Sequence, residues 1–252
     1  DDHGIHPVES HIKSGGTRVT FENKTAIEQV VIIEKMAWSD QAATAAQVTT
    51  LQTFRDLFSS EVLRPMEQIT VTNLTIMFTD LKGSTAMYQE VGDASAFGRV
   101  MDHFTVLRQC VSTHHGSIIK TIGDAVMAAF IDPAEGVAAA LDMMQEIATY
   151  NADNPSPPLC IKVGLHTGSC IAINQNDRLD YFGSTVNIAA RIEDQSNGDE
   201  VVISESVMSD LGVKQFLADS TLIVTSCTAE LKGFQESLPL YRIASRKKKE
   251  PE

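Results

Sequence analysis

The chain has 252 residues, of which 43% are apolar and 21% are charged, and its formal net charge is −13. This balance is that of an ordinary globular protein, and the length allows one main domain with an additional segment. Because excess negative charge repels a phosphate backbone, we expect neither nucleic acid nor an anionic membrane surface as a partner. Any phosphate group that the chain binds must be held locally, by metal ions or individual cations.

The sequence also excludes a membrane span and a zinc site. No run approaches the roughly 18 apolar residues that cross a bilayer, and the N-terminus has no apolar signal region. We expect a fragment of a longer protein, because the chain starts at Asp1 without an initiator Met. The cysteines have neither CxxC nor Cys/His spacing, which predicts free thiols in a reducing compartment, the cytoplasm. They are Cys110, Cys160, Cys170 and Cys227.

Residues 1–65 are interpreted as the end of an upstream domain with a regulatory or coupling role, followed by a connecting helix. Thr17–Phe21 and Gln29–Met36 are rich in β-branched residues and predict a hairpin. Ser39-Asp40 predicts a helix start. The helix carries apolar residues at helical spacing and ends at Pro65; these residues are Leu51, Phe54, Leu57 and Phe58.

From residue 66 to residue 245 we expect one domain in which strands alternate with helices. The apolar run Leu74–Thr79 predicts a strand that ends at Asp80, and Ser84 and Thr85 then offer helix caps. A long helix follows and ends near Gly116. Its apolar face is assigned to the core and consists of Phe97, Val100, Met101, Phe104, Leu107 and Val111.

Gly123-Asp124 predicts the turn of a hairpin between Ser117–Ile122 and Ala125–Phe130. Asp132-Pro133 starts the next helix. Its inward face is predicted to consist of Val137, Leu141, Met144 and Ile147. Further strands are predicted at Ile161–Leu165, Cys170–Ile173, Val201–Ile203, Leu222–Thr225 and Leu238–Ile243. This order favours an α+β fold with helices packed on a mixed or antiparallel sheet. Residues 246–252 form a charged, solvated tail.

Two aspartates stand where predicted strands meet solvent. Taken alone, Asp80 and Asp124 are each typical of a cap or a turn. However, Asp80 precedes Lys82-Gly83-Ser84-Thr85, whose backbone N–H groups could bind phosphate oxygens at a helix start. Hard oxygen ligands beside a phosphate site suit Mg²⁺ or Mn²⁺. Asn187 and Arg191 lie four residues apart on one face of a predicted helix, and by themselves indicate only a solvated pair.

Five ordered motifs together resemble the class III adenylate and guanylate cyclase family over roughly residues 69–244. They are Phe78–Thr85, Lys120–Asp124, Gly164–Gly168, Phe182–Arg191 and Leu231–Gly233. The resemblance implies a ferredoxin-like βαββαβ core and a head-to-tail homodimer with active sites at the dimer interface. Residues 17–63 are similar, more weakly, to the end of a domain of unknown function that precedes some bacterial cyclases.

The resemblance also implies a role for each matching residue. Asp80 and Asp124 correspond to the aspartates that hold two divalent metal ions, and Asn187 and Arg191 to the transition-state residues. The implied substrate-binding residues are the base-reading pair Lys120 and Asp180, the triphosphate lysine Lys232, and the backbone amides of Leu81, Lys82, Gly83 and Ser84. Guanylate cyclases of the family usually carry Glu and a Cys or small polar residue in place of the base-reading pair.

The sequence therefore predicts an adenylate cyclase that converts ATP to 3',5'-cyclic AMP and pyrophosphate in intracellular signalling. One alternative is a guanylate or dual-specificity cyclase, which a panel of substrates separates from this interpretation. Another is a non-catalytic cyclase-like module that dimerises. Such modules usually lose a metal-binding aspartate or the arginine, whereas this chain retains both. We interpret His166, distant in sequence from either aspartate, as a structural histidine.

Overall fold

The computed structural model describes residues 43–58, 63, 67–154, 156–176, 178–234 and 237–245. All of these belong to one compact unit that begins at Ala43. The predicted hairpin at 17–36, the helix start at Ser39-Asp40 and the tail at 246–252 lie outside the described residues. None of the described helices has the length and apolar character needed to cross a membrane.

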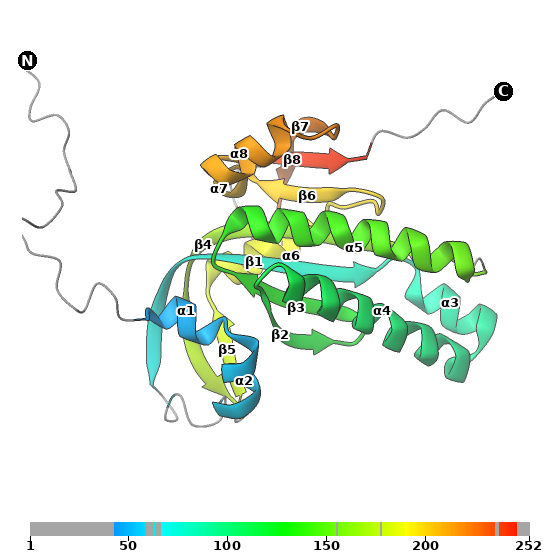
Figure 1. Cartoon of the computed structure of the whole chain (residues 1–252), viewed down its shortest axis with the longest axis horizontal. Coiled ribbons are helices and arrows are strands. Elements are labelled where there is room, and N and C mark those ends of the chain that lie inside the picture. The colour runs from blue at the N-terminus through cyan, green and yellow to red at the C-terminus, as the bar shows by residue number, and fades with distance from the viewer. Residues whose placement is uncertain are drawn as a thin grey trace, which may run out of the picture. The chain divides into compact units, whose positions relative to one another are not determined.

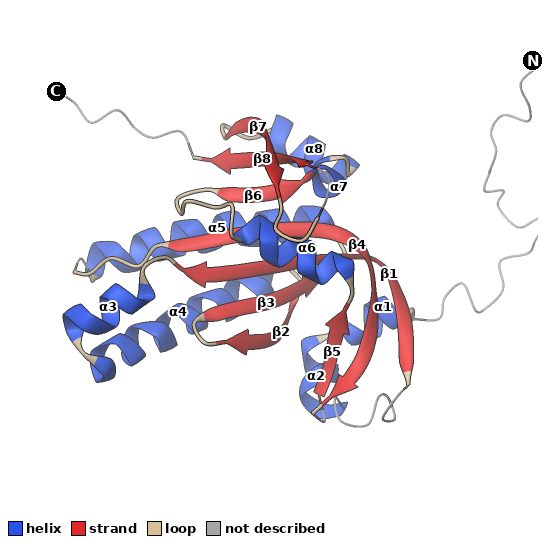
Figure 2. Ribbon diagram, turned by 180° about the vertical axis from the view of Figure 1, so that it is seen from behind, coloured by secondary structure: helices blue, strands red, loops and turns tan. Residues whose placement is uncertain are grey.

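A mixed eight-stranded sheet forms the centre of the unit, as Figures 1 and 2 show. Strand β1 (Gln68–Leu81) lies in its middle and pairs antiparallel with both β3 (Ala125–Phe130) and β4 (Ile161–Gln175). The strand order is β2-β3-β1-β4-β6-β8-β7, and β5 pairs with β4 as well. The other strands are β2 (Ser117–Ile122), β5 (Arg178–Phe182), β6 (Val201–Ser204), β7 (Ile223–Glu230) and β8 (Ser237–Ala244). The predicted α+β class is confirmed.

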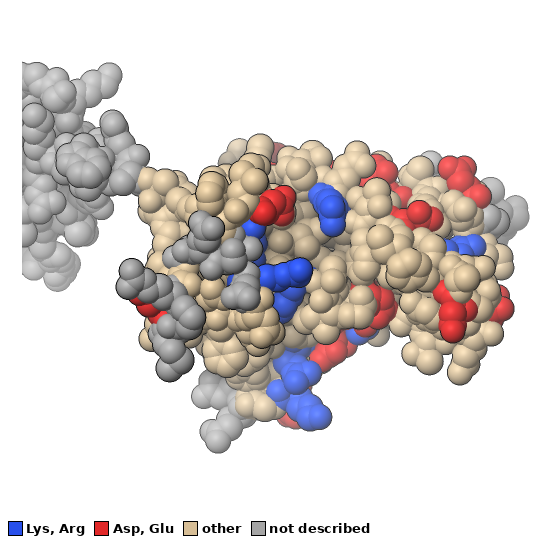
Figure 3. All heavy atoms as spheres, turned by 90° about the horizontal axis from the view of Figure 1, so that it is seen from below, with Lys and Arg blue, Asp and Glu red and all other residues tan. Residues whose placement is uncertain are grey.

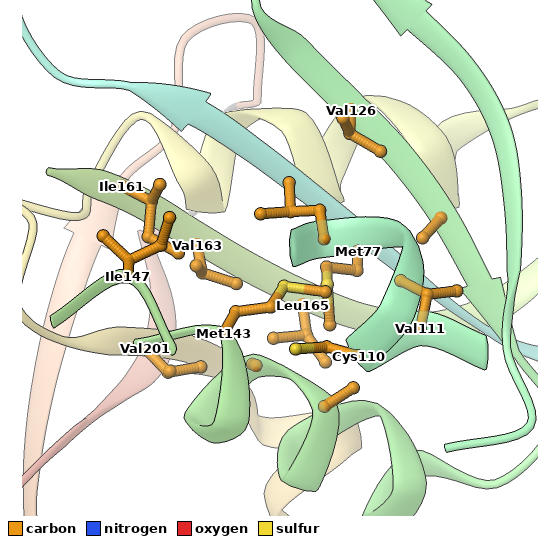
Figure 4. Packing of buried hydrophobic residues seen from close by; sticks show 14 of the residues in the cluster. Met77, Cys110, Val111, Val126, Met143, Ile147, Ile161, Val163, Leu165 and Val201 are labelled. Atoms are coloured by element: carbon orange, nitrogen blue, oxygen red, sulfur yellow. The ribbon is translucent and has the colours of Figure 1, made fainter. Parts of the chain in front are cut away.

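Helices cover the two faces of the sheet in separate layers. Alternation along β1 sends Met77 to one face and Ile76 and Phe78 to the other. Met77 packs with α4 (Asp93–Thr113) and α5 (Pro133–Asp153), and Figure 4 shows Met77, Cys110 and Met143 meeting in this core. On the other face lies α6 (Ser184–Glu193). The remaining helices are α1 (Ala45–Thr49), α2 (Gln52–Phe58), α3 (Ser84–Val91), α7 (Glu205–Met208) and α8 (Leu211–Ala218).

The single helix predicted after the turn at 82–85 is in fact two helices, and the prediction of its inward face was wrong in part. Gly92, at φ 78°, separates α3 from α4, which ends close to Gly116 as expected. Phe97 and Met101 were assigned to the core, but they are 60% and 46% exposed. The inward face of α4 is instead made by Ala96, Val100, His103, Leu107, Cys110 and Val111. It is offset from the face that the large apolar side chains indicated, because small Ala96 and polar His103 occupy buried positions.

The two strands predicted at 161–165 and 170–173 are one strand, β4. The polar residues between them do not break it, because they find partners: Thr167 Oγ1 lies 2.7 Å from Thr75 Oγ1 on β1. Gly168 leaves room for α6, since a Cβ there would lie 2.6 Å from Thr185 Oγ1. Strand β5 and helices α7 and α8 were not predicted, and the connecting helix is the two short helices α1 and α2.

Candidate active site

Strand pairing brings Asp80 and Asp124 together at one edge of the sheet. Thr79 on β1 lies opposite Val126 on β3, so the turn that carries Asp124 sits beside the end of β1. Burial raises the pKa of Asp80, and the negative charge of Asp124 raises it further. Asp124 Oδ2 is buried and has no hydrogen-bond partner among the described residues. Two carboxylates in this environment fit a bound cation, since an unpaired buried carboxylate oxygen is costly.

The two carboxylates match a hard divalent ion that takes its remaining ligands from a substrate and from water. Asp80 and Asp124 supply carboxylate oxygens, the ligands that Mg²⁺ and Mn²⁺ prefer. Within the described ranges, no group of three or more His, Cys, Asp or Glu side chains is placed to hold a metal. A Mg²⁺ site of this kind takes its other ligands from water and from substrate phosphates. The residues therefore fit the ion that the sequence implied.

Sequence reasoning missed the neighbours of this pair. Lys162 lies opposite Asp80 in the β1–β4 register, and its Nζ lies 3.0 Å from Oε1 of the buried Glu193. His103 on α4 is fully buried, and burial lowers its pKa to about 4 despite the opposing charge of Asp124. These residues carry no sequence motif. Only the strand register and the helix packing place them beside the aspartates.

The turn after β1 leads into α3 and offers a smaller phosphate-binding set than expected. Gly83, at φ 75°, occupies the N-cap position without a side-chain cap, so the first amides of α3 remain available to an anion. Lys82 is already engaged: its amide donates to the Cys160 carbonyl at 2.8 Å and its Nζ to the Asn197 carbonyl at 2.6 Å. The Leu81 amide hydrogen-bonds the Asp80 carboxylate, which partly offsets the raised pKa of that group. The amides of Gly83 and Ser84 are those left for phosphate.

Lys120 and Asp180, which lie on β2 and β5, form a direct ion pair. Lys120 Nζ lies 2.6 Å from Asp180 Oδ2, and the Tyr181 amide donates to Asp180 Oδ1 at 2.8 Å. The Asp180 side chain is 11% exposed and that of Lys120 is 34% exposed. An ammonium that is partly exposed thus stands beside a nearly buried carboxylate.

Helix α6 presents Asn187 and Arg191 to solvent, and Lys232 is exposed in the turn between β7 and β8. Arg191 Nη1 lies 3.1 Å from Asp194 Oδ2, an exposed pair of little energetic weight. Gly164 on β4 lets α6 approach closely, because a Cβ there would lie 2.2 Å from the Glu193 backbone nitrogen. Among the described residues, no hydrogen bond or ion pair joins these three side chains to Asp80 or Asp124.

His166 has the surroundings of a structural histidine. Its Nδ1 lies 2.8 Å from Ser204 Oγ, and burial lowers its pKa to about 4. The four cysteines that the sequence predicts to be free are unpaired in the structure. On the face drawn in Figure 3, Lys and Arg side chains gather mainly over the middle, and most of the Asp and Glu side chains lie toward the right end.

Comparison with known proteins places the chain in a family. The family model for the adenylate and guanylate cyclase catalytic domain matches residues 66–238. An adenylate cyclase of Anabaena cylindrica is 27% identical over 185 residues, which cover 68% of this chain and 36% of that protein. The chain therefore spans about a third of the length of this relative.

Solved structures share the fold. The adenylyl cyclase CyaB from P. aeruginosa superposes with a TM-score of 0.62 at 24% identity, over 72% of this chain and 98% of that one. The guanylate cyclase domain of RhGC from Catenaria anguillulae, in complex with GTP, superposes with a TM-score of 0.61 at 20% identity, over 71% of this chain and 100% of that one. The fold is thus shared by cyclases of both nucleotide types.

Proposed function

The chain belongs to the adenylate and guanylate cyclase catalytic domain family, and from that premise we propose that it converts ATP to 3',5'-cyclic AMP and pyrophosphate in intracellular signalling. The observation that carries the choice of ATP is the ion pair between Lys120 and Asp180, 2.6 Å apart. The choice rests on the chemistry of this pair, because the relatives include cyclases of both nucleotide types.

The pair is complementary to adenine. The 6-amino group of adenine donates hydrogen bonds and its N1 accepts one, so the carboxylate of Asp180 and the ammonium of Lys120 match them. Asp180 accepts one bond from Lys120 and one from the Tyr181 amide, and a carboxylate has about four acceptor positions, so it can still accept from the amino group. Guanine presents the reverse pattern and would leave these groups unpaired, which supports discrimination against GTP.

In the proposed reaction the ribose 3'-hydroxyl oxygen bonds to the α-phosphorus while the bond to the β-phosphate breaks. Pyrophosphate leaves, and the hydroxyl proton passes to water or a substrate phosphate. Asp80 and Asp124 would hold two Mg²⁺ or Mn²⁺ ions, which lower the pKa of a hydroxyl and neutralise phosphate charge when bound. Arg191 would stabilise the charge that grows on the α-phosphate oxygens, since a fixed guanidinium acts most strongly in the transition state.

Other groups would position the substrate. Asn187 would orient the ribose ring, and Lys232 with the amides of Gly83 and Ser84 would hold the β- and γ-phosphates. We assign Asn187 and Arg191 to the active site of a second copy, because they are exposed and the resemblance implies a head-to-tail homodimer. A two-fold axis would then build two equivalent sites. The free thiols support a cytoplasmic location for this activity.

The test is a substrate panel. Purified protein is incubated with ATP or GTP and with Mg²⁺ or Mn²⁺, and cyclic products are quantified; we expect mainly cyclic AMP. The double variant Lys120→Glu, Asp180→Cys should lose most of its preference for ATP. A matched control, Lys214→Glu with Asp219→Cys, makes the same chemical changes at two exposed positions, one in α8 and one directly after it. This control should keep the preference for ATP.

Each other outcome has a defined meaning. Mainly cyclic GMP from the unaltered chain would contradict the choice of ATP and favour the guanylate cyclase alternative. An unchanged preference in the Lys120 and Asp180 double variant would refute base reading by this pair. Absence of any cyclic product from a folded, metal-loaded dimer would favour a non-catalytic module.

A further inference from the structure

Helices α1 and α2 lie beside β2 and β5, the strands that carry Lys120 and Asp180 (Figures 1 and 2). They precede the residues that match the family model, which begin at 66. A capping box between Thr44 and Gln47 fixes the start of α1. Both helices are short, so contacts with the sheet, more than intrinsic helix stability, must hold them in place.

Arg55 is the buried residue of α2. It is 6% exposed, whereas the apolar side chains of Leu57 and Phe58 on the same helix are 67% and 46% exposed. Its guanidinium donates to the Thr49 carbonyl at 3.0 Å and to the Leu179 carbonyl, and it lies 5.6 Å from the centroid of the Tyr181 ring. A buried guanidinium is costly unless its hydrogen bonds are satisfied, and stability alone would be served as well by an apolar side chain.

The groups that Arg55 holds are the two neighbours of Asp180. The Leu179 carbonyl belongs to the peptide bond that leads into Asp180, and Tyr181 follows it. Tyr181 is fixed a second time, because its hydroxyl donates to Thr49 Oγ1 at 2.8 Å, and its amide binds the Asp180 carboxylate. The residues on both sides of Asp180 are therefore tied to helices α1 and α2, Leu179 through its carbonyl and Tyr181 through its side chain.

The same helices also hold the strand that carries Lys120. The Ser117 hydroxyl donates to the Thr50 carbonyl, and the Ile118 amide donates to Gln52 Oε1 at 2.9 Å. Strand β2 has a register irregularity between Ile118 and Lys120, so its pairing with β3 alone does not fix this stretch. One connecting segment thus contacts both of the strands that carry the base-reading pair.

We propose that Arg55 is a positioning residue that sets the place of Asp180, and that α1–α2 thereby controls which base the site accepts. This inference rests on the proposed function, in which Lys120 and Asp180 read adenine. Displacement of α2 releases the Leu179 carbonyl and the Tyr181 ring, and Asp180 then loses the geometry that selects the adenine amino group. The segment that enters the catalytic domain from its N-terminal side is in this way linked to substrate recognition.

The test compares the full chain with its Arg55→Gln variant, which lacks the positive charge and the guanidinium that bonds the Thr49 and Leu179 carbonyls. We expect KM for ATP to rise about 10-fold with kcat within a few-fold, and the preference for ATP over GTP to fall about 10-fold. Arg55→Lys keeps the charge but lacks the planar guanidinium whose two nitrogens reach the two carbonyls, so it should recover only part of the preference. In an Asp180→Asn background the Arg55→Gln change should have little further effect on the preference, because coupled residues are not additive.

The matched control is Val213→Ala, which opens a cavity at a fully buried position in α8, a helix remote from α1 and α2 in Figure 1. It should lower the melting temperature and leave the ATP preference unchanged. If Val213→Ala shifts the preference as much as Arg55→Gln does, the effect is general destabilisation and the proposal is overturned. Wild-type KM and preference in folded Arg55→Gln protein would overturn it directly.

Two milder variants keep the proposal testable if Arg55→Gln does not fold. Tyr181→Phe and Thr49→Val each remove one hydroxyl of the 2.8 Å hydrogen bond between Tyr181 and Thr49. Each should lower the preference for ATP over GTP, by a smaller factor than Arg55→Gln. An unchanged preference in both would overturn the proposal. If the unaltered chain prefers GTP, the proposed function fails on that measurement alone, while an Arg55-dependent change in base preference would still support positioning of Asp180.

Discussion

Replacing Gly164 with alanine tests whether the contact between β4 and α6 positions Arg191. A Cβ at Gly164 would lie 2.2 Å from the Glu193 backbone nitrogen and 2.5 Å from its Cα. Both are main-chain atoms, so no side-chain rotation relieves the clash. Ordinary contact begins at 3.4 Å, and α6 must therefore move away from the sheet by about 1 Å.

The displacement should cost activity more than stability. Overpacking of this kind costs about 1–3 kcal/mol, and for a domain of this size each kcal/mol lowers the melting temperature by roughly 2–4 °C. Arg191 and Asn187 would move with α6. A catalytic group misplaced by about 1 Å costs up to about 100-fold in rate, so kcat should fall by one to two orders of magnitude.

The assay measures the melting temperature and kcat of the Gly164→Ala protein beside a matched control, Gly136→Ala. Gly136 lies inside α5, and the contacts nearest a Cβ there are side-chain atoms, beginning with Leu165 Cδ2 at 3.1 Å. Alanine is also favoured over glycine within a helix by about 1 kcal/mol. The control should therefore keep kcat and melt no more than slightly lower. Wild-type kcat in folded Gly164→Ala protein would refute the reasoning.

Three further changes have defined outcomes. We expect Mn²⁺ to raise the melting temperature of the unaltered chain, and Asp124→Ala should abolish both this rise and the activity. A rise that persists in Asp124→Ala protein would contradict the metal assignment. Arg191→Ala should lower kcat by about 100-fold with KM within a few-fold, and a change confined to KM would contradict a transition-state role. His114 is partly buried, which lowers its pKa, but hydrogen bonds to Asp142 and Glu135 prevail and raise it. The charged His114 therefore stabilises the folded state through Asp142 and Glu135, fully below the unfolded-state pKa and no longer once pH rises through the folded-state pKa. His114→Gln should accordingly lower the melting temperature more at pH 5.5 than at pH 9. Equal losses at the two pH values would refute a contribution from charged His114.

Much of the sheet and its helices could be predicted because local chemistry and periodicity agree there. Asp132 caps α5 through the Ala134 amide at 2.8 Å and Pro133 follows it, as its sequence predicted. Elsewhere tertiary contacts decide. Phe97 is exposed because α4 turns small Ala96 toward the sheet instead. Periodicity alone does not reveal which residues can approach the sheet.

The candidate site shows the same division. The motifs predict roles for Asp80, Asp124 and the Lys120–Asp180 pair, because the family pattern assigns these positions. They do not indicate that the Lys82 amide and ammonium are already bonded within the chain, since both partners are main-chain carbonyls far away in sequence. Nor do they reveal Arg55, whose partner Leu179 lies on a strand 124 residues away. Such contacts carry no local signal.

The most direct test of a cyclase with shared active sites is complementation between two inactive chains. Asp80→Ala and Arg191→Ala proteins are co-refolded, subunit exchange is verified, and cyclic AMP formation from ATP is measured. Half of the dimers are then mixed and each has one intact site, so activity should return to about one quarter of the wild-type value. A mixture of Asp80→Ala with Asp124→Ala, which both lack the metal half of the site, should stay inactive. If the first mixture also stays inactive, Arg191 does not act across a dimer interface and the account is contradicted.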